Sequence, residues 1–176
     1  QLMGQESQFS VAQRRELLQL MQGCIQGLIP RSKALADSGQ IELSMTPYMH
    51  PIVPLLHDFK NMRDALPDAP APEASHYPGG LARSRWHMEQ GLMVFERYFG
   101  RKPQGVWLSE GGVSEDALSL LDEFHIRWTA SGEGVWGKSC EISGIQGEDV
   151  ASKRALFQSY QQSQHQVRLF FRDDGL

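Results

Sequence analysis

The sequence predicts an α/β protein, namely part of a TIM-like barrel with parallel strands. Strand-like apolar runs alternate with segments of helical periodicity, as expected for repeated βα units. The four strand-like runs are too few to close a barrel. The 176 residues are therefore expected to form a fragment of a single (β/α) barrel domain, 1–176, with both ends cut. A chain of this length is sufficient for a substantial core.

Three segments have helical periodicity. The first begins at Ser10, whose spacing to Gln13 is that of a capping box. Pro30 is expected to kink or interrupt this helix, because proline lacks a backbone N–H. The second helix is predicted over residues 81–99. Ser114 is the predicted N-cap of the third, which has acidic residues in its first turn.

Four strands and two long loops are predicted between and beside these helices. Strands are predicted over 40–46, 105–108, 126–130 and 167–171. The region 47–80 is rich in proline and has no sustained period, so a long loop is expected there. Residues 131–149 are rich in glycine and are also expected to form a loop, with Trp136 inside it.

Composition narrows the class of protein. The net charge of -4 gives no indication of a nucleic-acid partner. No apolar run approaches the roughly 20 residues needed to cross a membrane, and no signal peptide is visible. The two cysteines cannot form a disulfide framework or a zinc site, so a cytoplasmic protein is expected. No metal-binding motif or phosphate-binding loop is present, and no cofactor is expected.

Carboxylates follow two of the predicted strands. Glu110 ends the run 105–108, and Asp173 with Asp174 follows the last run. In a parallel barrel these positions share one rim, where the catalytic groups of such barrels are found. Two carboxylates facing one cleft are what glycosidic bond cleavage requires. The alternative is that they cap loops or pair with Arg172 and Arg127.

Three blocks of the sequence, taken together, resemble glycoside hydrolase family 57. They are GQIELSMTPYMHPIVPLL at 39–56, GVWLSEG at 105–111 and FFRD at 170–173. The resemblance covers most of the chain from about residue 14. It implies an incomplete (β/α)7 barrel and a retaining mechanism on α-glucan polysaccharides or oligosaccharides. Hydrolysis and transfer both remain open, as do the linkage and the oligomeric state.

The resemblance also implies roles for the carboxylates. By position, Glu110 matches the nucleophile of the family and Asp173 its acid/base, with Asp174 as a rival for the second role. The family's first block, a His-Gln-Pro strand end, would precede residue 1, and the segment that completes the acid loop would follow Leu176. The chain alone is therefore expected to lack part of the site and to be inactive by itself.

Seven further residues are candidate substrate contacts: Glu42, Tyr48, His50, Trp107, Trp128, Glu133 and Trp136. His50 stands close to two prolines and suits a hydroxyl-binding role. The aromatic rings can stack on the apolar faces of sugars, although core packing is the alternative for the two tryptophans within strands. At Glu133 the family usually has Asp-Glu, and here Gly132 replaces the aspartate.

Two other classes of protein fit parts of the sequence. A metal-dependent polysaccharide deacetylase has a similar barrel, but it needs an aspartate and paired histidines, and that spacing does not occur here. A non-catalytic carbohydrate-binding barrel would keep the fold, and the replacement at Gly132 leaves room for it.

Overall fold

A computed structural model describes residues 7–175 of the chain, which divides into two compact units, Gln1–Leu43 and Ser44–Leu176. The first unit contains helix α1 (Val11–Asp37). Ser10 forms the predicted capping box with Gln13. Of the kink or interruption predicted at Pro30, the interruption does not occur, because the helix continues through this residue. Proline removes one backbone hydrogen bond, and the other turns of a long helix can outweigh that loss.

The second unit is built on a parallel sheet. Strands β1 (Gly105–Trp107), β2 (Trp128–Gly132) and β3 (Arg168–Arg172) are hydrogen-bonded in the order β1-β2-β3. All pairs are parallel, so the three strands end at one edge. The predicted α/β class with parallel strands is confirmed in this sheet, and each strand lies within two residues of its predicted position.

The predicted strand over 40–46 is wrong except at one residue. Met45 forms an isolated parallel bridge with Val106 of β1. Its N–H donates to the carbonyl of Gly105 (3.2 Å), and its carbonyl accepts from the N–H of Trp107 (2.8 Å). Alternating apolar residues predict a strand only where a neighbouring strand supplies a ladder, and β1 is too short to pair with more of this segment.

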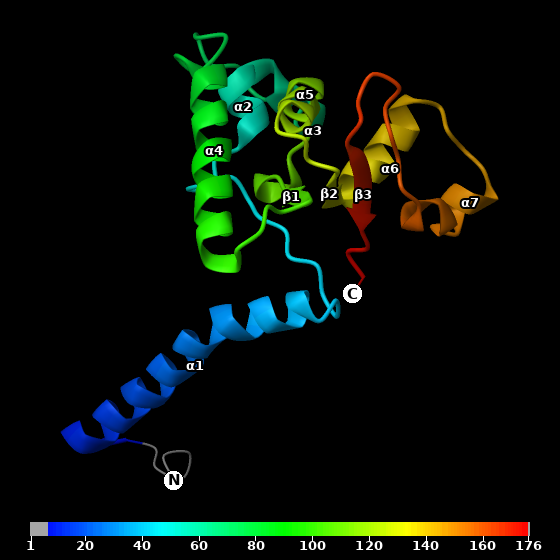
Figure 1. Cartoon of the computed structure of the whole chain (residues 1–176). Helices are drawn as coiled ribbons and strands as arrows, with labels where there is room; N and C mark the ends of the chain where they lie inside the picture. Colours follow the sequence, from blue (N-terminus) through cyan, green and yellow to red (C-terminus); the bar gives the residue numbers. More distant parts are fainter. Residues whose placement is uncertain (1–6, 176) are drawn as a thin grey trace. The chain divides into compact units, whose positions relative to one another are not determined.

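Helices lie on both sides of the sheet (Figure 1). On the β1 side are α2 (Val53–His57), η2 (Phe59–Asn61), α3 (Met62–Ala65), α4 (Gly80–Phe99) and α5 (Glu115–Glu123). Beside β3 are α6 (Glu133–Ile142), α7 (Glu148–Ala151) and η4 (Arg154–Phe157). The region 47–80, expected to be a loop, thus contains three short helical segments. Ser114 caps α5 as predicted.

Two groups of buried side chains form the core. The first contains Val106 of β1, Leu108 directly after this strand, Leu120 and Leu121 of α5, and Met88 of α4, which are all buried. A second cluster contains Trp136, Cys140 and Leu156. The loop predicted over 131–149 is therefore wrong, because its first half forms α6 and packs Trp136 and Cys140 inward.

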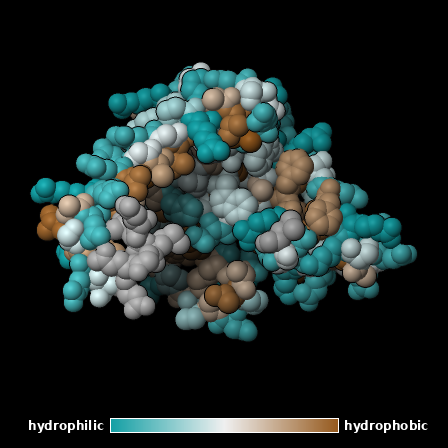
Figure 2. Space-filling model, turned by 90° about the horizontal axis from the view of Figure 1, so that it is seen from below, coloured by the Kyte–Doolittle hydropathy of each residue, from teal (hydrophilic) through white to brown (hydrophobic). Residues whose placement is uncertain are grey.

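The surface is mostly polar on the face shown in Figure 2, where hydrophobic side chains occur in small separate groups. Within residues 7–175, no helix has the length and the apolar composition needed to span a bilayer.

Candidate active site

The end of β1 presents a carboxylate from strained backbone. Leu108 is fully buried and Ser109 begins the short 3₁₀ turn η3 (Ser109–Gly111). Glu110 within this turn has φ of +57°, a left-handed conformation that a residue with a Cβ rarely adopts. Its side chain is 73% exposed. Strained residues of this kind cluster at functional sites, where the surrounding structure fixes them.

The turn at Glu110 is fixed to the neighbouring strand. Gly111 follows with φ of +66°, and its carbonyl accepts a hydrogen bond from the buried hydroxyl of Ser131 at 2.6 Å. This bond joins the loop after β1 to the last part of β2, so the backbone of Glu110 is held at the C-terminal edge of the sheet.

His50 contacts the carboxylate of Glu110. The imidazole Nε2 lies 3.2 Å from Glu110 Oε1, and Nδ1 lies 3.2 Å from the hydroxyl of Thr46. A carboxylate can only accept, so Nε2 carries the hydrogen and Nδ1 accepts from Thr46 when the ring is neutral. His50 also has a positive φ, +57°. The structure thus places His50, a predicted substrate contact, beside the predicted nucleophile.

Two aspartates follow β3, and their surroundings differ. Asp174 Oδ1 accepts from two nitrogens of Arg172, at 2.8 and 3.2 Å, and Arg172 lies 5.8 Å from the ring centre of Trp107. Asp173 Oδ1 accepts from the N–H of Gly175 at 2.9 Å. The Asp173 side chain is 19% exposed and that of Asp174 is 48% exposed.

Glu133, at the start of α6, connects the end of β2 to this pair. Its Oε2 accepts from the N–H of Asp174 (3.2 Å), and its Oε1 lies 2.6 Å from the ammonium of Lys153. The same ammonium lies 3.8 Å from Asp173. The hydrogen bond to Glu133, reinforced by the charges of Glu133, Asp173 and Asp174, raises the pKa of Lys153 above its ordinary value.

The two predicted catalytic carboxylates therefore follow β1 and β3, with β2 between them. Two strand spacings of about 4.8 Å separate β1 from β3, about 10 Å in all. Gly132 ends β2 in the gap and has no side chain. A Cβ there would meet only Asp174 Oδ2, at 3.9 Å. The space next to the end of β2 therefore holds no other heavy atom of the described residues within 4 Å of that position.

Three of the predicted aromatic contacts lie away from this edge. Trp128 is the first residue of β2, at the opposite end from Gly132, and its ring lies over Gly105. Trp136, expected in a loop, is 5% exposed and donates from Nε1 to the Tyr160 hydroxyl at 3.1 Å.

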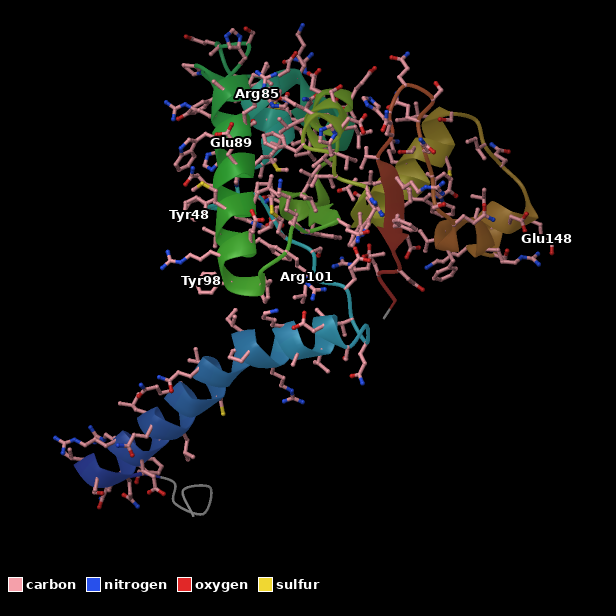
Figure 3. All side chains as sticks on the ribbon, in the orientation of Figure 1. Tyr48, Arg85, Glu89, Tyr98, Arg101 and Glu148 are labelled. Carbon is pink, nitrogen blue, oxygen red and sulfur yellow. The ribbon has the colours of Figure 1, made fainter. Side chains whose placement is uncertain are left out.

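Tyr48 lies against α4, on the side facing away from β1 in Figure 3, and its ring meets Trp86 edge-to-face at 5.9 Å. Of the remaining candidates, Trp107 lies at the C-terminal end of β1 and Glu42 belongs to the first unit.

Two residues of this region have no distinct signal in the sequence. Lys153 is a lysine in a polar segment, which does not distinguish it from other surface lysines. Thr46 precedes His50 by four residues, and this spacing is the one local indication of their contact. Among residues 7–175, no group of three or more His, Cys, Asp or Glu side chains is arranged to hold a metal ion.

Comparison with solved structures gives the fold a context. The chain matches a GH57-type branching enzyme from Pyrococcus horikoshii with a TM-score of 0.59 and 16% identity, over 92% of this chain and 27% of that one. It matches a GH57 branching enzyme from Thermococcus kodakaraensis, in complex with glucose and additives, with a TM-score of 0.55 and 19% identity, over 90% and 28%. It matches the alpha-amylase AmyC from Thermotoga maritima with a TM-score of 0.58 and 14% identity, over 92% and 25%.

At these identities the similarity shows the fold alone. The chain spans about a quarter of the length of each of these proteins. A segment of 65 residues is 37% identical to thiamine thiazole synthase from Pyrobaculum arsenaticum. It covers 34% of this chain and 25% of that protein, which is too little to show a relationship.

The family model of glycosyl hydrolase family 57 matches residues 3–176, nearly the whole chain. The chain therefore belongs to glycosyl hydrolase family 57.

Proposed function

We propose that the protein cleaves α-glucosidic bonds in α-glucans by a retaining mechanism, as a hydrolase or a transglycosylase. The chain would supply one part of a single catalytic domain, an incomplete (β/α)7 barrel. The observation that carries the proposal is the edge formed by the strand ends. Glu110 stands there on strained backbone with His50 on its carboxylate, and Asp173 follows the strand on the other side of β2.

Glu110 is the proposed nucleophile. Its exposed carboxylate can approach an anomeric carbon, and attack there would give a glycosyl-enzyme intermediate. The Nε2–H of His50 fixes one of its oxygens, which leaves the other for attack. The His50 ring is half-exposed, so a sugar hydroxyl that replaced Thr46 at Nδ1 would give it the hydroxyl-binding role proposed from the sequence.

Asp173 is the proposed acid/base. It would protonate the leaving oxygen and then activate water or an acceptor sugar. Asp174 Oδ1 is held by two nitrogens of Arg172, at 2.8 and 3.2 Å. The cation nearest to Asp173, Lys153, lies at 3.8 Å and is hydrogen-bonded to Glu133. These contacts support Asp173 over its rival, because its carboxylate is held less closely and can reach a leaving oxygen.

The substrate class rests on the family and on its members of known structure. Those matched here are two branching enzymes and an alpha-amylase, and one of them is in complex with glucose. These neighbours leave both transfer and hydrolysis open for the present protein. Trp107 and Glu133 remain proposed substrate contacts, whereas the positions of Trp128, Trp136 and Tyr48 give no support for that role.

The test uses the full-length protein with a panel of α-glucans, followed by NMR of the first product to record its anomeric configuration. Wild type should release the α-anomer first, or transfer with retention. Glu110→Ala should lower turnover at least about a thousandfold. Glu115→Gln, an exposed glutamate five residues away on α5, is the matched control and should be unaffected. Retained turnover in Glu110→Ala, or an inverted first product, would refute the proposal.

A further inference from the structure

A single lysine connects the ends of β2 and β3. Lys153 stands between α7 and η4, about twenty residues before Asp173 in the sequence. Its ammonium lies 2.6 Å from Glu133 Oε1 and 3.8 Å from Asp173 Oδ1. Glu133 in turn accepts the N–H of Asp174. The lysine therefore contacts both of the segments that determine where Asp173 lies.

The backbone at Lys153 supports a specific role. Its φ is +58°, in the left-handed region that costs an ordinary residue roughly 1 kcal/mol or more. Glycine would adopt this conformation without strain, but glycine has no ammonium. From this backbone the half-exposed side chain reaches both carboxylates.

The charges around Asp173 show what the ammonium does. Three carboxylates meet at this edge: Glu133 from α6, and Asp173 and Asp174 after β3. Arg172 is paired with Asp174, so Lys153 is the cation in contact with the other two. Without it, Glu133 would face Asp173 and Asp174 as an uncompensated negative charge.

We propose that Lys153 is a positioning residue for the acid/base carboxylate Asp173, which it holds at the edge of the sheet through Glu133. This inference rests on the proposed function. It adds the residue that fixes the orientation and the charge balance of Asp173, and it assigns Glu133 to that support as well as to substrate contact.

The experiment compares Lys153→Met, Lys153→Gln and Lys153→Arg with wild type in the full-length protein. Lys138→Met is the matched control, because Lys138 forms an exposed ion pair with Glu141 on α6, 2.8 Å long, away from the aspartates. The readout is kcat/KM for aryl α-maltooligosides with good and poor leaving groups. Circular dichroism records whether each variant folds.

The expected result concerns the leaving group, because a misplaced general acid matters most where the departing oxygen needs a proton. Misplacing the general acid should slow the poor leaving group about tenfold and the good one less than about threefold. Lys153→Arg should restore both rates, and Lys138→Met should match wild type.

Wild-type rates, or an equal loss on both leaving groups, in folded Lys153→Met and Lys153→Gln would overturn the inference. Glu110→Ala, measured in the same assay, distinguishes a failure of the proposed function from a failure of the role of Lys153. If Glu110→Ala keeps its turnover, the proposed function itself fails. If Glu110→Ala is inactive while the lysine variants keep the wild-type rates, only the role of Lys153 fails.

Discussion

Asp122 joins α5 to the start of β3, and its removal should loosen the strand that carries Asp173. Its carboxylate accepts from the backbone N–H of Gln166 (3.1 Å), the backbone N–H of Val167 (2.8 Å) and Nδ1 of His165 (2.9 Å). Through these hydrogen bonds Asp122 holds the segment just before β3 against α5. The Asp122 side chain is only 23% exposed.

The magnitude follows from these three bonds. A hydrogen bond to a charged group contributes about 1.5–3 kcal/mol, and less where water can replace it. About 1 kcal/mol for each bond gives about 3 kcal/mol for Asp122→Ala. That loss corresponds to roughly a hundredfold faster hydrogen exchange if the amides exchange by local opening. Asp122→Asn keeps one oxygen acceptor, so an increase of about tenfold is expected.

Hydrogen exchange followed by mass spectrometry of the full-length protein measures this effect on peptides that cover 165–172. Peptides from α4 report whether the change is local, and Asp68→Ala, at an exposed position, is the control substitution. An increase below about threefold in β3 would refute the role assigned to Asp122. An equal increase in α4 would show that the whole unit has been destabilised instead.

Three other substitutions test separate parts of the structure. Gly105→Ala would place a methyl group about 2 Å from the ring of Trp128, so we expect a loss of about 1–3 kcal/mol in a denaturant titration; an unchanged midpoint would contradict this packing. Burial lowers the pKa of His57 from its ordinary value of 6.5, with the charge of Arg85 adding to the effect and that of Asp116 opposing it. The unfolded chain therefore binds more protons, and stability that is complete above pH 6.5 should fall as the pH drops below it; His57→Phe should flatten this slope, and a slope equal to wild type would contradict it. His50→Ala should lower kcat/KM about 10- to 100-fold by freeing the carboxylate beside it, and wild-type kinetics would show that the contact is idle.

Local signals in the sequence predicted much of the fold. The apolar run 105–108 forms β1, and Ser114 caps α5. Both features depend on residues that are close together in the sequence, so a local pattern is sufficient to predict them. The wrong predictions concern segments whose structure depends on contacts with distant parts of the chain. The alternation over 40–46 found a partner only at Met45, and the glycine-rich segment after 131 became helical because Trp136 packs in the core.

In the candidate site, too, local features could be predicted and long-range contacts could not. The position of Glu110 after a strand could be predicted, since the apolar pattern shows where the strand ends. The contact of His50 with Glu110 spans sixty residues, and the contacts of Lys153 depend on how α7 and η4 return to the sheet. No local pattern encodes such contacts. The resemblance to a family predicted the residues of the edge, and the structure supplied the groups that hold them.

The most direct test of the account is the capture of the glycosyl-enzyme intermediate. The full-length protein is incubated with a fluorinated α-glucosyl or α-maltosyl fluoride that reacts slowly at the second step, then digested and analysed by mass spectrometry. We predict one glycosyl group per active site, on the carboxylate of Glu110, and no label in Glu110→Ala. A label on another residue of active enzyme, or inversion at the anomeric carbon without any label, would contradict the account.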